Sequence, residues 1–264
     1  MSSSTRDNMK ITKSLKGSEN SPVLVIGNGP SAKNLTANQI TRFRSLGGKI
    51  AVMNGFADSP LSKILAPDYY CLAEPGYWNP ANESDIQHLE RIEDLIASAS
   101  NDVVIVQPAH QIPIFASHKS YFFVDSRSVA GLYRSSRPDR PWGLPGSVAM
   151  MAIATMQFLG HSVIYFTGLD SVVSRSYFVD DLNQLLWDSR EHYFYEDIAY
   201  KKNRPGLAEP GVFIVEPGLL RNFADVLYSD AIFRNDLYWL MKDRCVNVGN
   251  DRTNDAAPRA CLIE

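Results

Sequence analysis

The sequence has few cysteines and no long apolar run. Its cysteines, Cys71, Cys245 and Cys261, are odd in number and far apart, so their spacing matches neither a disulfide framework nor a metal site. No stretch approaches the roughly eighteen apolar residues of a membrane-spanning helix, and residues 1–20 lack the apolar core of a secretory signal. The sequence therefore predicts a cytoplasmic protein with reduced thiols.

Charge of one sign is not in excess either. The formal net charge of −3 gives no general attraction to nucleic acid, so we expect no nucleic-acid partner. Of the 264 residues, 45% are hydrophobic and 21% are charged, which is typical of a globular chain of one α/β domain. We expect residues 1–20 to be a disordered segment, 21–250 to form the domain, and 251–264 to be a loose tail.

The most informative stretch is 23–31, where four apolar residues precede the sequence Gly-Asn-Gly-Pro-Ser. With a helix predicted over 32–46, this is the strand, turn and helix that begin a parallel α/β sheet. Gly27 and Gly29 permit close backbone approach, and their N–H groups beside a helix N-terminus would suit a phosphate. Asn28 can donate and accept hydrogen bonds, so it could bind a base or a ribose, or cap the helix.

Two further predicted strands also end in polar residues. Strand 49–53 leads to Asn54, and strand 69–73 leads to Glu74. Because the carboxyl ends of parallel strands face one crevice, we expect Asn28, Asn54 and Glu74 to lie at a common ligand site. Glu74 could equally be a solvated turn residue. The turn lacks the third glycine of the G-x-G-x-x-G dinucleotide fingerprint, which makes an ordinary NAD site a weak interpretation.

The rest of the chain alternates between predicted strands and helices, which favours a Rossmann-like, mostly parallel sheet flanked by helices. Ser147 opens an Ala-rich helix that Gly160 ends, and a strand at 162–166 leads to Asp170. Two irregular segments lie in a region that we interpret as a flexible lid at about 171–218. The further predicted helices are 58–66, 82–99, 183–200 and 229–243, the further strands are 102–106, 121–124 and 245–248, and the irregular segments are 171–182 and 203–218.

Two motifs resemble those of the bacterial sialyltransferases of glycosyltransferase family 42. The first is the Gly-Asn-Gly-Pro-Ser turn at 27–31. The second begins with Gly-Ser at 146–147 and the Ala-rich helix, and continues through Leu-Gly to the strand that ends in Thr-Gly-Leu-Asp at 167–170. The family has Ser-Gly where this chain has Gly-Ser. The resemblance covers about 22–250 in outline, and pterin-phosphorylating proteins share the first motif.

The resemblance implies a single-domain, GT-A-like glycosyltransferase variant of polysaccharide biosynthesis. Such enzymes use no metal or cofactor, and they move a sialic acid or a related nonulosonic acid from a CMP-sugar, with inversion, to a glycan or lipid-linked saccharide. His192 matches the family's general base, and Asp170 and Tyr177 would lie near the departing phosphate. The residues implied in donor binding are Gly27, Asn28, Gly29, Pro30, Ser31, Asn54, Glu74, Gly146, Ser147 and Arg175.

The chain departs from the family at several positions. Glu74 stands where the family has an asparagine, and Val172 stands where it has a tyrosine. The family arginine ahead of the Ser-Gly pair is missing, so Arg140 or Arg175 would have to hold the donor. The family's basic, membrane-attaching C-terminal region has no counterpart at 249–264, which leaves a peripheral location at the inner membrane without support.

Other interpretations stay open beside this one. A pterin-type pyrophosphokinase would need ATP and Mg²⁺, which the pair Asp180-Asp181 could bind; an inactive relative that binds a glycan or a partner protein would fit the departures above. The chain has no Asp-x-Asp motif, which argues against a metal-chelated nucleoside diphosphate donor. His192 could be a packed histidine, and the tyrosine-rich stretch 187–200 suits either a core or the surface of a homo-oligomer. The basic cluster, which is an exposed face or a phosphate or carboxylate site, comprises Arg134, Arg137 and Arg140.

Overall fold

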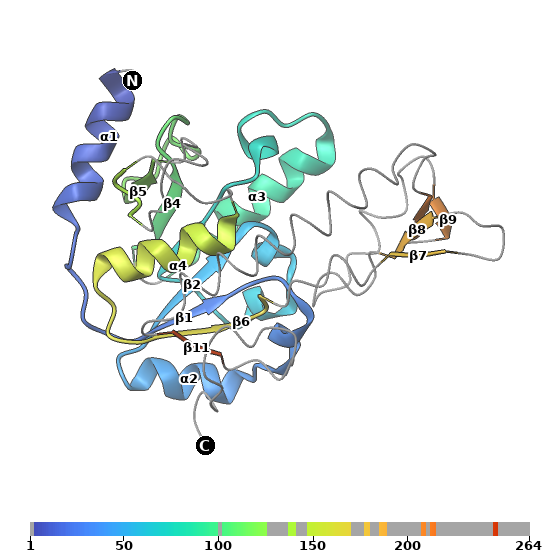
Figure 1. The fold of residues 1–264 in the computed structure, drawn as a ribbon, viewed down its shortest axis with the longest axis horizontal. Coiled ribbons are helices and arrows are strands. Elements are labelled where there is room, and N and C mark those ends of the chain that lie inside the picture. Colours follow the sequence, from blue (N-terminus) through green and yellow to red (C-terminus); the bar gives the residue numbers. More distant parts are fainter. Residues whose placement is uncertain are drawn as a thin grey trace.

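The computed structural model describes residues 3–99, 102–125, 137–140 and 147–169, and beyond these the backbone of five short strands. Helices or 3₁₀ turns separate the successive strands of residues 23–108 (Figure 1). The elements, with η for a 3₁₀ helix, are α1 (Ser3–Ser14), β1 (Val23–Ile26), η1 (Pro30–Asn34), α2 (Ala37–Ser45), β2 (Lys49–Met53), η2 (Asn54–Asp58), η3 (Pro60–Lys63), β3 (Tyr69–Cys71), η4 (Pro75–Trp78), α3 (Glu83–Ala97), β4 (Val104–Pro108), β5 (Tyr121–Val124), α4 (Val148–Leu159), β6 (Ile164–Thr167), β7 (Tyr177–Val179), β8 (Leu185–Asp188), β9 (Leu207–Glu209), β10 (Val212–Ile214) and β11 (Cys245–Asn247).

Seven strands form one parallel sheet in the order β11-β6-β1-β2-β3-β4-β5. The chain adds strands outward from β1 to the edge strand β5, and then returns through α4 to place β6 on the other side of β1. This confirms the predicted Rossmann-like α/β fold. In such a sheet, ligands bind outside the carboxyl ends of the two strands where the order reverses, which here are β1 and β6.

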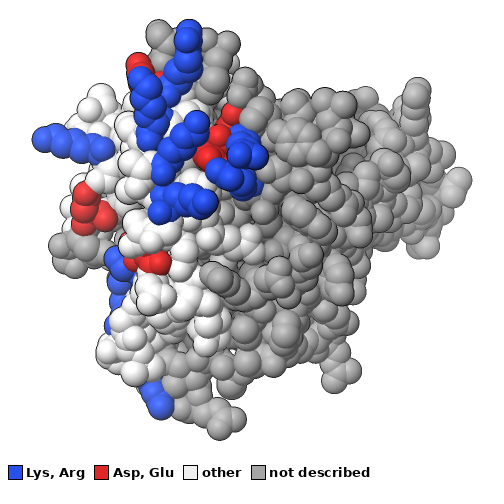
Figure 2. Space-filling model, turned by 60° about the vertical axis from the view of Figure 1, so that its left-hand side comes forward, with Lys and Arg blue, Asp and Glu red and all other residues white. Residues whose placement is uncertain are grey.

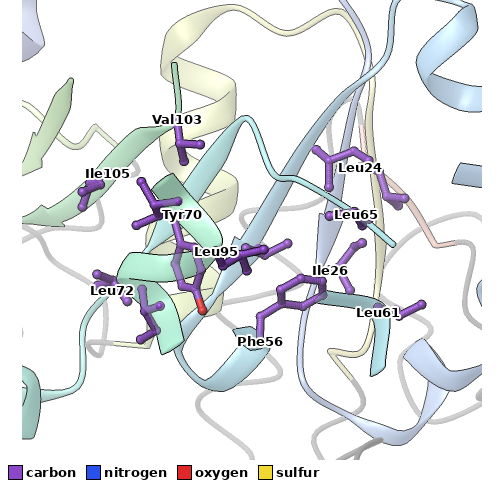
Figure 3. Packing of buried hydrophobic residues seen from close by; sticks show 14 of the residues in the cluster. Leu24, Ile26, Phe56, Leu61, Leu65, Tyr70, Leu72, Leu95, Val103 and Ile105 are labelled. Atoms are coloured by element: carbon purple, nitrogen blue, oxygen red, sulfur yellow. The ribbon is translucent and has the colours of Figure 1, made fainter. Parts of the chain in front are cut away.

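Both faces of the sheet are covered, which is why the central strands are apolar at every position. In β1, Val23 and Val25 pack with α4 on one face, while Leu24 and Ile26 pack with α2 and α3 on the other. Figure 3 shows the second cluster, in which Phe56 from η2 lies beside Ile26. These two cores fix the positions of the strand tips that follow.

Residues 1–20 are not a disordered segment as expected, because Ser3–Ser14 form helix α1. The helix packs along the edge strand β5, where the Thr12 hydroxyl donates to the Phe123 carbonyl (2.7 Å) and accepts from the Phe123 N–H (3.0 Å). Met9 is 4% exposed on the same side. Because α1 covers the unpaired edge of the sheet with few apolar residues, its pattern resembled a solvated segment.

Three predicted helices differ from the observed elements. Residues 32–46 are not one helix, because Thr36 and Gln39 form a capping box that begins α2 at Ala37, after η1. Residues 58–66 contain 3₁₀ turns on either side of Ser59, and Pro60 begins the second turn. The third is 183–200, where Leu185–Asp188 form strand β8. A short run such as Leu-Leu-Trp fits a strand as well as a helix.

Strands β7 to β10 form a second, antiparallel sheet in the order β7-β8-β10-β9. It falls in the proposed lid, where irregular segments were predicted. The predicted strand near 245–248 is observed as β11, whereas the helix at 229–243 and the tail at 251–264 lie outside the described residues. None of the helices in the described part of the chain has the length and apolar character needed to cross a bilayer.

Candidate functional site

The tips of β1 and β6 are joined by backbone hydrogen bonds beyond the ends of both strands. The Gly27 N–H donates to the Thr167 carbonyl (2.8 Å), and the Gly29 N–H donates to the Gly168 carbonyl (2.8 Å). The Gly168 N–H in turn donates to the buried hydroxyl of Ser31 (2.8 Å). The N–H groups of Gly27 and Gly29 are therefore already engaged and do not form the phosphate cradle that the sequence suggested. Ser31 likewise serves to hold the turn together.

Gly27 and Gly168 are glycines because their backbones touch. A Cβ atom on Gly27 would overlap the Gly168 carbonyl oxygen, and a Cβ atom on Gly168 would overlap the Gly27 carbonyl oxygen. Gly168 also has a φ of +71°, which a side chain would strain. The contact closes the space between β1 and β6, and the Asn28 side chain lies on the other side of the turn, toward β2.

Asn28 occupies the tip of β1 and is oriented by the neighbouring strand. Its Nδ2 donates to the carbonyl of Met53, the last residue of β2 (3.2 Å). This hydrogen bond fixes the amide orientation, because the reverse orientation would place two oxygens together. Oδ1 is then buried and has no hydrogen-bond partner among the described residues. A buried acceptor without a donor costs about 1–3 kcal/mol, so this atom marks a place for a ligand donor or a water.

Asn54 lies directly beside Asn28, at the tip of β2. Its Oδ1 accepts from the Ala73 N–H (3.1 Å), and its carbonyl accepts from the Tyr70 hydroxyl (2.7 Å). Asn54 has a φ of +40°, an uncommon conformation for a residue with a side chain, and such residues gather at functional sites. The two asparagines lie at adjacent strand tips, as expected, and their part in a ligand site stays a prediction.

Ser147 is placed at the same edge of the sheet by α4. Its hydroxyl accepts from the Met150 N–H (3.4 Å) and caps the helix, as predicted. The last residue of α4, Leu159, accepts from the Glu19 N–H (2.9 Å) near the start of β1, so the first turn of α4 lies toward the strand tips. The helix N-terminus carries a partial positive charge that favours an anion. Glu74 is exposed, at the start of η4 beyond β3.

The remaining predicted site residues are not located by the described structure. Gly146, Asp170, Arg175, His192 and Arg134 lie outside the described residues, and Tyr177 begins β7, of which only the backbone is described. Their roles stay predictions. Pro30 begins η1 and is half-buried beside Asn28.

The comparisons with known proteins give one distant structural similarity. No protein-family model and no curated protein sequence matches the chain. The solved structure of MAf glycosyltransferase from Magnetospirillum magneticum AMB-1 is similar in fold, with a TM-score of 0.49 and 13% sequence identity over 98% of this chain. This chain spans 38% of the length of that structure.

A carboxylate, an imidazole and a phenol form an array beyond the tips of β2 and β3 that sequence reasoning missed. His88 Nδ1 lies 2.7 Å from Asp58 Oδ2, and His88 Nε2 lies 3.2 Å from the Tyr77 hydroxyl. Arg91 Nε donates to Asp58 Oδ1 (2.6 Å). The sequence gives no signal for this array, because 30 residues separate His88 from Asp58 and no local pattern joins them. The array ties α3 to η2 and η4, and it resembles an acid–base relay in its chemistry.

The Asp58 carboxylate is expected to make stability depend on acid pH. Burial favours the neutral form, but the hydrogen bonds and charges of His88 and Arg91 outweigh it and lower the pKa of Asp58. A lowered folded-state pKa adds stability above the unfolded pKa, near 3.9, that is lost as the pH falls through the folded value. We expect Asp58→Asn to reduce the free energy of unfolding at pH 7 by about 1–3 kcal/mol and to flatten its decline in acid.

Urea unfolding between pH 3 and 7 measures this effect. Asp7→Asn is the matched control, because Asp7 pairs with Lys10 on the exposed side of α1 and should change little. An Asp58→Asn protein with the same acid profile as the parent would contradict the array's contribution.

The end of α4 is held by residues with structural roles. Gly160 ends α4 with a φ of 97°, and the following His161 is fully buried between the Ser21 carbonyl (2.9 Å) and the Tyr69 hydroxyl (3.2 Å). Burial lowers the pKa of His161 and raises the pKa of the buried Cys71 thiol, so both stay neutral at pH 7.

Proposed function

We propose that this protein is a metal-independent, inverting glycosyltransferase that moves a sialic acid or a related nonulosonic acid from a CMP-sugar to a glycan or lipid-linked saccharide. The observation that carries the proposal is the buried, unpartnered Oδ1 of Asn28 beside Asn54. Both asparagines match family residues that bind CMP.

The two amides offer complementary groups to a pyrimidine. Asn28 Oδ1 is an acceptor, and Asn54 has its Oδ1 engaged by Ala73, so its remaining hydrogen-bonding group is the Nδ2 donor. Cytosine presents an amino donor beside ring-nitrogen and carbonyl acceptors, whereas uracil presents an N–H between two carbonyls. An acceptor fixed by Met53 and a neighbouring donor suit cytosine, which donates through its amino group and accepts at N3. Uracil can also meet such a pair, through N3–H and O4, so the comparison of CMP with UDP decides between the two bases.

The CMP phosphate would lie toward the first turn of α4. The N–H groups of Gly27 and Gly29 already donate to the carbonyls of Thr167 and Gly168. Ser147 and the positive end of α4 are therefore the described groups best suited to the phosphate. Arg175 would add a cation that pairs with the phosphate or the donor carboxylate.

In the proposed reaction, the acceptor hydroxyl oxygen attacks the anomeric carbon as the bond from that carbon to the CMP phosphate breaks. The hydroxyl proton passes to the imidazole of His192, and CMP leaves with the bonding electrons. A neutral imidazole suits this role, because its pKa of about 6.5 leaves it unprotonated at cytoplasmic pH. Tyr177 and Asp170 would lie near the leaving phosphate and the acceptor.

Calorimetric titration with CMP, UDP, GDP and ATP, each with and without Mg²⁺, tests the donor assignment. We expect CMP to bind without metal, and Asn28→Ala to weaken CMP binding about tenfold, since hydrogen bonds in a buried site contribute about 1.4 kcal/mol or more. Asn34→Ala, an exposed asparagine in η1, is the matched control and should bind CMP normally. Failure to bind CMP would remove the assignment, and Mg²⁺-dependent ATP binding in its place would favour the pyrophosphokinase.

A further inference from the structure

A basic cavity of about 290 Å³ lies between the end of α1, the turn at 137–140 and the last turn of α4. Four cationic side chains and one carboxylate surround it over an aromatic ring. The turn supplies three of the charged residues, and the chain around the end of α1 supplies two. The lining residues are Lys13, Lys16, Arg137, Asp139, Arg140 and Phe158.

The basic cavity is separate from the strand-tip site. Phe158 lies eleven residues after Ser147 on α4, which corresponds to about 16 Å along the helix. The Gly17 N–H donates to the Phe158 carbonyl (3.0 Å) and holds the end of α1 against this last turn. The predicted role of Arg140 in holding the donor is therefore not supported, because the structure places Arg140 with Lys13 and Lys16.

The cavity holds one acid–base pair, and its single carboxylate faces four cationic side chains. The Asp139 carboxylate is buried and accepts from Arg137 through Nε (2.9 Å) and Nη2 (2.6 Å). This pair neutralises one positive charge and fixes the guanidinium. Lys13, Lys16 and Arg140 are exposed, and no ion pair joins their side chains to another described residue.

The helix dipole alone does not explain this arrangement. A lysine near the end of α1 is favourable there, which accounts for Lys13. The helix dipole does not account for Arg137 and Arg140, which belong to a distant part of the chain and line the same cavity. Figure 2 shows Lys and Arg gathered on this side of the molecule. Gathered like charges repel each other, and a bound anion would relieve that repulsion.

We propose that the basic cavity binds an anion that carries phosphate groups, at a second site distinct from the donor site. Lysines and an arginine together suit phosphate, which accepts hydrogen bonds from both. The volume is near the lower end of typical ligand sites, roughly 300–1,000 Å³, so the bound group is about the size of a pyrophosphate or a sugar phosphate. The same chemistry is offered by a soluble phosphorylated compound and by a phospholipid headgroup.

Calorimetry with inorganic pyrophosphate, with and without saturating CMP, tests the basic cavity. The double variant Lys16→Ala/Arg140→Ala should weaken pyrophosphate binding about tenfold or more while CMP affinity stays unchanged. Lys63→Ala/Lys119→Ala removes two exposed lysines elsewhere and is the matched control. A parallel sedimentation assay compares vesicles of phosphatidylcholine alone with vesicles that also contain phosphatidylglycerol.

Each result decides the proposal. Pyrophosphate binding lost only in the cavity variant supports a soluble ligand, and phosphatidylglycerol-dependent sedimentation lost only in that variant supports a lipid headgroup. Equal binding by both double variants, or no binding to either probe, overturns the proposal. If the protein binds pyrophosphate through this cavity but does not bind CMP, the second site stands and the proposed CMP-sugar donor is wrong.

Discussion

Gly27→Ala is expected to lower the free energy of unfolding by about 3 kcal/mol, because the added methyl group would meet a backbone carbonyl that cannot move aside. The Gly168 oxygen that it would overlap is held by the Gly29 N–H (2.8 Å). The side chain of Leu169 would also be displaced. Urea unfolding followed by circular dichroism measures the loss.

Gly168→Ala should produce a similar loss, because its Cβ atom would overlap the Gly27 carbonyl and its φ is positive. Gly76→Ala is the control. Gly76 lies in η4, and a Cβ atom there would meet only the flexible Glu74 side chain at 4.0 Å, so its effect should stay within about 0.5 kcal/mol. If Gly27→Ala were as stable as the control, the joined tips of β1 and β6 would not be the rigid feature that positions Asn28.

The parallel sheet could be predicted because its signals are local. Val23–Ile26 is apolar at every position, as a strand covered on both faces must be, and Gly160 ends the apolar helix α4 at the expected place. Asn28 and Asn54 follow from the same reasoning, since each comes within two residues of the end of a strand and the strands are adjacent. Elements whose burial and periodicity agree are readable from a single sequence.

The parts that could not be predicted depend on contacts between distant residues. The sequence shows two glycines at 27 and 29, but not that Thr167 and Gly168 would accept their N–H groups. Helix α1 was not predicted because Thr12 binds the edge strand through its hydroxyl group, and a hydrophobic pattern does not reveal such a contact. The contact between Asp58 and His88 could not be predicted either, because the two residues lie far apart in the sequence.

The difference between the two asparagines also has a physical explanation. Asn54 has its oxygen used to join β2 to β3, whereas Asn28 has its nitrogen used and its oxygen left buried. The fold therefore uses the amide nitrogen of Asn28 and the amide oxygen of Asn54, which leaves an acceptor on the first side chain and a donor on the second. A site with one fixed acceptor and one neighbouring donor favours a ligand that presents a donor beside an acceptor, because a ligand without them would leave buried groups unpaired.

A large loss of turnover is expected when the proposed general base, His192, is replaced. His192→Gln should reduce turnover of a CMP-sugar about 10²–10⁴-fold, because general-base catalysis contributes that much, while CMP affinity changes little. In the parent protein, turnover should fall as the pH drops below about 6.5, where the imidazole gains a proton and no longer accepts one. Steady-state kinetics with a CMP-sugar, together with calorimetry of CMP, separate the two effects.

His88→Gln is the control for His192→Gln, because His88 is a half-buried imidazole beyond neighbouring strand tips with an orienting carboxylate, Asp58, at 2.7 Å. We expect His88→Gln to retain turnover, since His88 Nε2 faces the Tyr77 hydroxyl at 3.2 Å within the fold. If His192→Gln stayed active and His88→Gln did not, the base would be the Asp58–His88 pair. Equal loss of CMP binding in both variants would instead indicate damage to the donor site, because a general base acts on the acceptor hydroxyl and not on the bound nucleotide.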